Sequence, residues 1–378
     1  MSSKILSLQD GCHCRKGESV MLTKLDHVHR IHGYLPGYKP EELIYITWNF
    51  TTTCNFACTY CPKELHDGRW GFPKYDNMLN FFKKLSEGIP RKSYITMELL
   101  GGEPTMWPKL IDFVIEVKKF FADKEQRLVI MLDTNLSRTN RWFEKLRDCE
   151  LWDMIIINSS YHADFCDPDL FYSNLEIISK TYVTHANMMI DPRHFHKVKD
   201  LVEKIKANLP VDMAMKVLRP DLGSTQLVDG YTEEMLEYIT ALTGKFQYDR
   251  ENFNVIGEKN TGFPLQVYGD YSKVNWQKII IEKKHKFKGW KCSAGSKRFY
   301  IQPNGNIFPC SKFIDVYLDE NGERKHNFAE NHPNRKWILG NINDNNFEIF
   351  DKYIVCPIDY CPCKIDTVCD KHKINTTL

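Results

Sequence analysis

The chain has 378 residues, with 51 Lys and Arg against 49 Asp and Glu, so its formal net charge is +2. Hydrophobic residues make up 42% and aromatic residues 13%, enough for a sizeable buried core, which excludes a mainly disordered chain. The balanced charge argues against a nucleic-acid partner and against binding to anionic membranes.

Apolar runs in the sequence, such as 128–132 and 154–157, are far shorter than the roughly 18 residues that a membrane-spanning helix needs. The first 20 residues carry charged side chains and contain no apolar stretch of the kind found in a signal peptide. We therefore expect no membrane partner and a cytoplasmic location.

Strand and helix patterns alternate from about residue 43 onward. The predicted strands are 43–48, 94–100, 128–132, 154–158, 183–190 and 211–218, and the predicted helices are 77–85, 110–121, 140–149, 169–180 and 195–207. This alternation predicts an α/β fold with a parallel sheet and crossover helices.

The segments outside this alternation are less regular. Residues 1–40 have no clear period and are interpreted as an N-terminal extension, and residues 244–290 are polar and hard to assign. Asn304-Gly305 is a strong turn signal between two short apolar strands, 298–301 and 307–309, and predicts a hairpin.

The 13 cysteines are the most informative feature. In a reducing cytoplasm, clustered cysteines indicate metal ligands or catalytic thiols rather than disulfides. Cys54, Cys58 and Cys61 lie within eight residues directly after the first predicted strand. A structural zinc site would be closed by a fourth ligand, whereas a [4Fe–4S] cluster held by three thiolates keeps one iron open for chemistry.

The spacing C-x3-C-x2-C after a first strand resembles the radical S-adenosylmethionine (radical SAM) superfamily, and Tyr60 matches its aromatic preference before the third cysteine. The resemblance implies that the three cysteines hold a [4Fe–4S] cluster whose open iron binds S-adenosylmethionine. One electron from the cluster would then cleave this cofactor to methionine and a 5′-deoxyadenosyl radical. The alternative is a zinc knuckle completed by His66 or a remote residue.

Gly101, Gly102 and Glu103 follow the second predicted strand. In the radical SAM family a Gly-Gly-Glu motif at this place contacts the amino group of the cofactor's methionine. Glycine permits close approach of the backbone to a ligand, and a carboxylate can accept a hydrogen bond from an ammonium group. A simple strand-to-helix turn is the alternative.

Polar residues near the ends of later strands are further candidates, because functional residues of α/β barrels gather at the carboxyl ends of the strands. The resemblance implies contacts to S-adenosylmethionine from Asn135 and Ser159. His162 is a candidate for proton transfer, and Arg219, after the sixth strand, is the second catalytic candidate. Helix caps and ordinary loop residues are the alternatives.

The last quarter of the chain holds a second group of cysteines. The segment from Cys292 through Gly305 to Cys310 resembles the auxiliary iron–sulfur extension called SPASM, or its shorter form, Twitch. This resemblance implies at least one auxiliary [4Fe–4S] cluster. Further ligands are expected among Cys356, Cys361, Cys363 and Cys369.

The spacing of these last four cysteines departs from SPASM, which expects C-x2-C-x5-C-x3-C. Only the five-residue interval between Cys363 and Cys369 matches. The six cysteines of this quarter fill one four-ligand cluster and leave two over, so we expect one auxiliary cluster. Cys12 and Cys14, or His372, are the candidates that would complete a second cluster.

The resemblances imply a radical SAM core over 41–220, a connecting segment over 221–289 and a SPASM/Twitch-like auxiliary domain over 290–378. The expected architecture is a partial (β/α)6 barrel of the TIM type with a small cluster-binding α+β domain. The expected activity is a radical SAM oxidoreductase that abstracts a hydrogen atom and oxidises the substrate radical through the auxiliary cluster. An electron donor such as flavodoxin or ferredoxin is implied.

Two substrate classes remain open. The N-terminal 40 residues are too few for a leader-binding winged helix, which favours a small metabolite such as a sugar or aminocyclitol. The alternative is a peptide-modifying maturase, for crosslinking or epimerisation, with a separate leader-binding partner. A zinc or iron–sulfur scaffold or sensor is the non-enzymatic alternative.

Overall fold

The computed structural model describes residues 42–122, 124–149, 151–219, 227–243, 246–249, 254–257, 286–314, 316–318, 324–326, 336–347, 353–357, 361 and 371–372. The predicted N-terminal extension, with Cys12 and Cys14, lies outside the described residues, and so do Cys363 and Cys369. Among the residues that are described, no helix is both long enough and apolar enough to cross a membrane.

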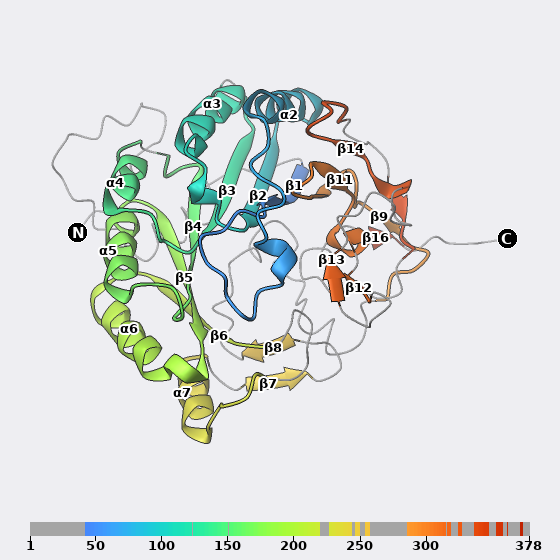
Figure 1. Ribbon diagram of the computed structural model, residues 1–378. Helices are drawn as coiled ribbons and strands as arrows, with labels where there is room; N and C mark the ends of the chain where they lie inside the picture. The colour runs from blue at the N-terminus through green and yellow to red at the C-terminus, as the bar shows by residue number, and fades with distance from the viewer. Residues whose placement is uncertain are drawn as a thin grey trace, which may run out of the picture.

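A curved nine-stranded sheet with the order β14-β11-β10-β1-β2-β3-β4-β5-β6 forms the centre of the molecule (Figure 1). Its parallel part consists of β1 (Glu42–Thr51), β2 (Ser93–Gly101), β3 (Arg127–Thr134), β4 (Ile155–Tyr161), β5 (Val183–Ile190) and β6 (Asp212–Val217). This arrangement confirms the predicted α/β class and the partial (β/α)6 barrel.

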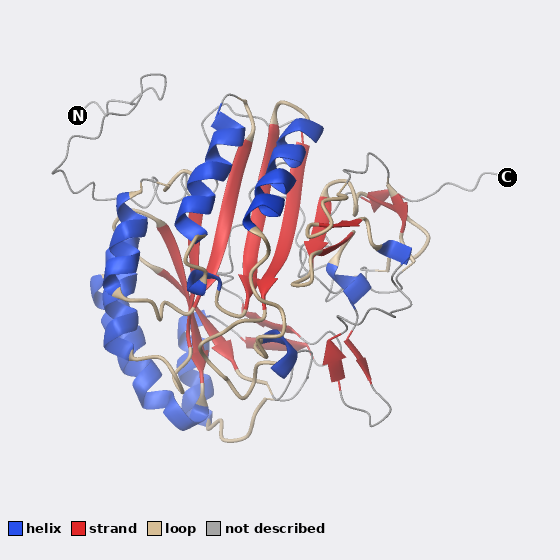
Figure 2. Ribbon diagram, turned by 45° about the horizontal axis from the view of Figure 1, so that its top comes forward, coloured by secondary structure: helices blue, strands red, loops and turns tan. Residues whose placement is uncertain are grey.

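Helices follow the strands and cover the outer face of the sheet (Figures 1 and 2). They are α2 (Tyr75–Gly88), α3 (Leu110–Ala122), α4 (Asn140–Asp148), α5 (Pro168–Ser179), α6 (Phe195–Asn208) and α7 (Glu233–Thr243). Short 3-10 turns precede some of them, including η2 (Pro104–Met106) directly after β2 and η3 (Pro192–His194) after β5. The loops after the strands therefore gather at one end of the barrel, as the parallel direction requires.

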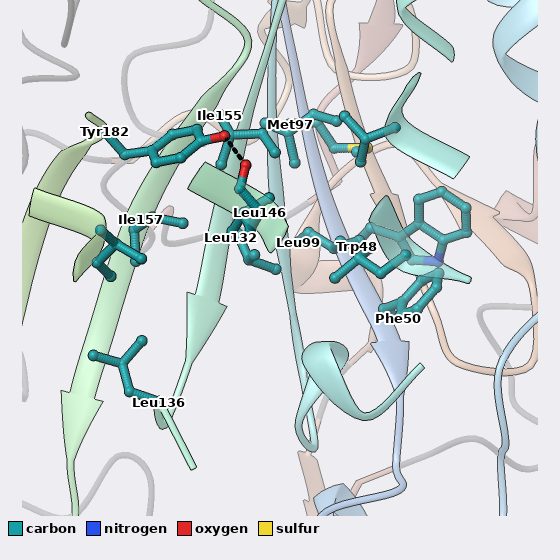
Figure 3. Close-up of a cluster of buried hydrophobic side chains, with 14 of the residues drawn as sticks. Trp48, Phe50, Met97, Leu99, Leu132, Leu136, Leu146, Ile155, Ile157 and Tyr182 are labelled. Carbon is teal, nitrogen blue, oxygen red and sulfur yellow. Dashed lines mark hydrogen bonds between the residues drawn. The ribbon is translucent and has the colours of Figure 1, made fainter. Parts of the chain in front are cut away.

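The hydrophobic core lies between the sheet and these helices (Figure 3). Alternate strand residues such as Trp48, Leu99 and Ile157 are fully buried there, and the hydroxyl of Tyr182 donates a hydrogen bond of 2.6 Å to the carbonyl oxygen of Leu146. Each such large apolar side chain stabilises the fold by about 1.5–3 kcal/mol. Because successive strand residues point to opposite faces, the residues between these positions face the concave side of the sheet.

The C-terminal part of the chain continues the central sheet. Strand β10 (Arg298–Ile301) pairs in parallel with β1, with Tyr45 opposite Arg298. Strands β11 (Asn306–Phe308) and β14 (Gly340–Asn341) extend the sheet further in antiparallel pairing. The hairpin predicted around Asn304-Gly305 is therefore present, but its attachment to β1 joins segments about 250 residues apart, and no local pattern predicts such a contact.

Three smaller sheets complete the described structure. The first contains β15 (Ile354–Val355), β9 (Lys291–Cys292) and β16 (Lys371–His372), in that order. The second pairs β12 (Val316–Leu318) with β13 (Arg324–His326). The third pairs β7 (Phe246–Asp249) with β8 (Asn254–Gly257). Strands β7 and β8 fall in the polar stretch that the sequence leaves unassigned.

Contacts with α2 hold the C-terminal part against the barrel. The ring of Phe347 is 5% exposed and lies 4.8 Å from the ring of Phe81 and 5.9 Å from that of Phe299. The side-chain amide of Asn77 donates a hydrogen bond of 2.7 Å to the carbonyl oxygen of Asn343. Apolar packing and amide contacts therefore combine at this junction.

Candidate active site

The loop that carries the first three cysteines leaves β1 at Thr51 and is closed at its base by hydrogen bonds. The backbone nitrogen of Thr52 donates to the carbonyl oxygen of Trp70 at 2.8 Å, and the nitrogen of Gly68 donates to that of Thr52 at 2.9 Å. Within the loop, the nitrogen of Cys61 donates to the carbonyl oxygen of Cys58 at 3.1 Å. The cysteine spacing is thus folded into a compact turn at the barrel's loop end.

The three thiols of this loop influence one another. Burial and, to a lesser extent, the neighbouring thiolates raise the pKa of Cys58 to about 11 and that of Cys61 to about 12. Burial also raises the pKa of Cys54. Metal binding requires thiolates, and a positively charged iron centre would relieve their mutual repulsion. Three close soft ligands with a fourth position left to another molecule therefore fit a [4Fe–4S] cluster.

The two glycines after β2 lie directly against this loop. The nitrogen of Gly102 donates to the carbonyl oxygen of Thr51 at 2.8 Å, and that of Glu103 donates to Thr53 at 2.8 Å. A Cβ atom added to Gly102 would lie 2.1 Å from the carbonyl oxygen of Thr53, and Gly101 has a φ of +116°. Only glycine at both positions allows this approach.

The Glu103 carboxylate is 1% exposed and is bound by protein donors. It accepts hydrogen bonds from the nitrogen and hydroxyl of Thr105 at 3.1 and 2.5 Å, and from the hydroxyl of Thr134 at 2.8 Å. The nitrogen of Asn135 donates to it at 2.6 Å. Burial raises the pKa of this carboxyl, and the donated bonds oppose that rise. The carboxylate therefore links the ends of β2 and β3, a role that the sequence does not predict.

Asn135 continues this link to the cysteine loop. Its side-chain amide donates to Oδ1 of Asn55 at 3.1 Å, and Asn55, the residue after Cys54, donates to Oγ of Ser137 at 2.8 Å. The series Glu103–Asn135–Asn55 thus connects the Gly-Gly-Glu motif with the cysteine motif. Two motifs separated by about 40 residues in sequence share one hydrogen-bonded framework.

Tyr60 and His162 form a second contact of the cysteine loop. The Tyr60 hydroxyl and Nδ1 of His162 share a hydrogen bond of 2.6 Å, and their rings stack at 5.9 Å with an interplanar angle of 15°. Burial lowers the pKa of His162 to about 4. An imidazole with this pKa stays neutral near pH 7, so the structure gives His162 a clear role as the partner of Tyr60.

Two other sequence candidates come from β4 and from the end of β6, and Ser159 of β4 lies opposite Thr134 of β3 in the strand register. Strand β4 extends to Tyr161, so Ser159 lies inside the strand rather than after it. The Ser159 hydroxyl is fully buried and donates to the carbonyl oxygen of His185 at 3.0 Å. Arg219 is half-buried just after β6, the strand at the edge of the sheet.

The structure brings three cysteines of the last quarter together. Cys292, Cys310 and Cys356 are 4%, 8% and 8% exposed and share one buried cluster with apolar residues that include Phe308 and Phe313. The nitrogen of Cys356 donates to the carbonyl oxygen of Trp290 at 2.8 Å, which sets it beside β9. Cys361 is also buried. This soft, water-poor donor set fits an auxiliary iron–sulfur cluster.

The glycine of the second motif also has a steric explanation. Gly305 has a φ of +88°, and a Cβ atom there would lie 2.6 Å from Oδ1 of Asn341 and 2.7 Å from Nδ2 of Asn343. Asn341 in turn donates to Oδ1 of Asn306 at 2.7 Å. The turn that precedes Cys310 is therefore held by asparagines from a distant segment.

Comparisons with known families agree with this geometry. Residues 48–219 match the radical SAM superfamily, and residues 292–353 match the iron–sulfur cluster-binding domain SPASM. The chain belongs to the radical SAM superfamily and carries a C-terminal SPASM domain. Its cofactors are a [4Fe–4S] cluster with an open site, S-adenosylmethionine and an auxiliary iron–sulfur cluster. These matches do not support the alternative of a zinc scaffold.

Several solved structures are similar to this chain. The structure of anSMEcpe with bound AdoMet is 14% identical, covers 80% of this chain and 78% of its own, and has a TM-score of 0.46. BtrN in complex with AdoMet and 2-DOIA is 14% identical, with coverages of 81% and 80% and a TM-score of 0.32. SuiB of Streptococcus suis is 12% identical, with coverages of 85% and 70% and a TM-score of 0.31. No curated protein sequence matches the chain.

Proposed function

We propose that this radical SAM enzyme is an oxidoreductase whose Cys54, Cys58 and Cys61 hold the open [4Fe–4S] cluster. When bound, the cluster and S-adenosylmethionine supply a 5′-deoxyadenosyl radical that takes a hydrogen atom from the substrate. The observation that carries the proposal is the Glu103–Asn135–Asn55 series, which joins the Gly-Gly-Glu motif to the cysteine loop.

Around this cluster, the backbone of Gly101 and Gly102 and the side chain of Asn135 are proposed to contact S-adenosylmethionine. Tyr60 is proposed to border the same site, held in place by His162 through their hydrogen bond of 2.6 Å. Glu103 and Ser159, whose side chains are engaged with protein groups, are proposed to position the strand ends around the cofactor. Arg219, just after β6, remains a proposed catalytic candidate.

The auxiliary cluster is proposed to be held by Cys292, Cys310, Cys356 and Cys361. The burial of these four thiols supports this assignment. Cys363 and Cys369, outside the described residues, are the remaining candidates. We also propose the division into a core over 41–220, a connecting segment over 221–289 and an auxiliary domain over 290–378, with β10 and β11 crossing from that domain into the central sheet.

The proposed outcome is oxidation of a small polar substrate, with the auxiliary cluster as electron acceptor and a flavodoxin or ferredoxin as electron donor. Half-buried polar side chains on the concave face of the sheet, including Asp133, Asn158 and Asn187, suit a polar molecule. A peptide substrate with a separate leader-binding partner is the second possibility.

Deuterium transfer tests this proposal while the substrate is still unidentified. Cells of the source organism are grown in heavy water, and their extract is separated into a small-molecule and a peptide fraction. The reconstituted enzyme is incubated with each fraction, S-adenosylmethionine and reductant, and deuterium in 5′-deoxyadenosine is measured by mass spectrometry. We expect deuterium from the small-molecule fraction.

The control is the Cys54/Cys58/Cys61→Ala variant, which should form no 5′-deoxyadenosine. Deuterium from the peptide fraction alone would favour the peptide-modifying alternative. Unlabelled 5′-deoxyadenosine from both fractions would contradict hydrogen abstraction from a cellular substrate.

A further inference from the structure

A row of polar side chains crosses the concave face of the sheet, opposite the helix-covered core. The register places Asp133 of β3 opposite Asn158 of β4, and Ser160 of β4 opposite Asn187 of β5. Glu98 of β2 lies on the same face. Each of these side chains is half-buried, whereas Met131 and Ile156, nearer the start of the strands on that face, are buried. Along these strands, the side chains of the concave face therefore become accessible to solvent at this row.

The row is connected by hydrogen bonds that orient Asp133. The side-chain amide of Asn158 donates to Oδ1 of Asp133, and Asn187 donates to Oδ1 of Asn158 at 2.8 Å. On the other side, the hydroxyl of Thr47 donates to Oε2 of Glu98 at 3.0 Å. Asn158 binds one oxygen of the Asp133 carboxyl and thereby orients it.

Asp133 also lies next to the cofactor framework. It directly precedes Thr134, which donates to Glu103, and it is two residues from Asn135, which contacts the cysteine loop. Two residues of a strand span about 6–7 Å. A substrate that gives a hydrogen atom to a radical formed at that loop must therefore lie within reach of this part of β3.

The charges around Asp133 raise the pKa of its carboxyl, so its carboxylate binds a proton more strongly than that of an ordinary aspartate. Burial and the negative charges of Glu98 on β2 and Glu103 beside η2 raise the pKa of Asp133, and the bond from Asn158 opposes this only in part. Further along the face, burial and Lys216 of β6 lower the pKa of His185 on β5 to about 4, so that imidazole is neutral. A nearby carboxylate raises the pKa of a carboxyl toward neutral pH, so the carboxyl can take up and release a proton closer to pH 7.

We propose that Asp133, oriented by Asn158 and partnered by Glu98, is the catalytic base that accepts the substrate's proton during oxidation. This inference rests on the proposed function. In the step, the substrate carbon that has lost a hydrogen atom loses one electron to an iron–sulfur acceptor. The adjacent hydroxyl or amine loses its proton to the Asp133 carboxylate, and a double bond forms between that carbon and the oxygen or nitrogen.

Chemical labelling tests the protonation and access of Asp133 independently of turnover. The full-length protein is treated at pH 7 with a water-soluble carbodiimide and glycine ethyl ester, which modify protonated carboxyls, and is analysed by peptide mass spectrometry. We expect Asp133 to react at least about tenfold faster than Asp148, an exposed control carboxylate with 66% side-chain exposure. In Glu98→Gln the negative neighbour is lost, so labelling of Asp133 should fall about tenfold. Labelling of Asp133 no faster than Asp148 would overturn the proposal.

Turnover with the deuterated extract tests the catalytic role. Asp133→Asn keeps an oxygen for Asn158 but cannot accept a proton, so it should form about one equivalent of deuterated 5′-deoxyadenosine and then turn over at least about 100-fold more slowly. The control Asp148→Asn should match the wild type. An Asp133→Asn rate equal to the wild type would exclude this base. A wild type that transfers no deuterium would instead refute the proposed function, which separates the two failures.

Discussion

The Oε2 atom of Glu103 lies 2.6 Å from the backbone nitrogen of Asn135, and this single hydrogen bond joins the segment after β2 to the end of β3. The side-chain amide of Asn135 in turn donates a hydrogen bond to Asn55 inside the cysteine motif. The acidic residue of the Gly-Gly-Glu motif therefore determines where the cysteine loop lies relative to the sheet.

Replacement of this carboxylate tests the connection. In Glu103→Gln, the side-chain amide presents a donor where the carboxylate accepts from Asn135 or Thr105. We expect the free energy of unfolding to fall by about 1–3 kcal/mol, because a buried donor loses its partner. The affinity for S-adenosylmethionine should also fall. Urea denaturation and equilibrium dialysis measure the two effects.

The matched control is Glu116→Gln, which changes a carboxylate that pairs with Lys119 on the surface of α3 and is 42% exposed. Exposed pairs contribute little to stability. A Glu103→Gln protein as stable as this control, with wild-type affinity, would contradict the role of Glu103.

The two groups of cysteines should be separable by iron content. After anaerobic reconstitution, we expect about eight irons in the wild type and about four in Cys54/Cys58/Cys61→Ala, because each cubic cluster holds four. Iron and acid-labile sulfide analysis measures both. About twelve irons in the wild type would indicate a second auxiliary cluster and would involve Cys12 and Cys14. About four, all lost in the variant, would argue against an auxiliary cluster.

Close contact of the glycines with the cysteine loop predicts a strong effect of one methyl group. In Gly102→Ala the new Cβ would meet the carbonyl oxygen of Thr53 at 2.1 Å, a backbone atom that cannot move without shifting the loop. We expect loss of S-adenosylmethionine binding, measured by equilibrium dialysis, with the auxiliary iron retained. Gly71→Ala is the control, since nothing lies within 4 Å of its Cβ position. Equal binding by the two variants would be inconsistent with the close approach.

The junction between α2 and the C-terminal part should depend on Phe347. Its ring packs on Phe81 at 4.8 Å and is 5% exposed, so Phe347→Ala should destabilise the protein by about 3–5 kcal/mol. Iron analysis and thermal unfolding should reveal lower stability and preferential loss of auxiliary iron. Phe165→Ala removes a ring that is 45% exposed and stacks on Phe56 of the cysteine loop at 5.6 Å, so this comparison variant should retain its auxiliary iron. Preferential loss of iron from the first cluster in Phe347→Ala would contradict the assignment.

Local patterns were sufficient for much of the fold. The strands and helices between residues 43 and 218 are where their apolar periodicity predicts them, because each element buries one regular face. Three strands run past their predicted ends: β1 continues to Thr51, β3 to Thr134 and β4 to Tyr161. The polar Ser159 and Ser160 suggest a loop, yet the strand continues to Tyr161, because pairing with β5 satisfies their backbone groups.

The motifs could also be recognised in the sequence alone. The three cysteines, the Gly-Gly-Glu segment and the Cys–Gly–Cys pattern are short, so their spacing in the chain is close to their spacing in space. They were enough to predict the iron–sulfur clusters and the cofactor, which the family matches confirm.

Contacts between segments that are distant in the sequence could not be predicted from such local patterns. From the sequence, the carboxylate of Glu103 could bind either the cofactor or other protein groups. The hydrogen bond from the backbone nitrogen of Asn135 favours binding to protein groups. The pairing of β1 with β10, the convergence of Cys356 on Cys292 and the placement of Glu98 beside Asp133 depend equally on chain closure over long intervals. A linear sequence encodes the periodicity of each element and the spacing within each motif, but side chains from different strands become neighbours only when hydrogen-bond register and packing bring those strands together.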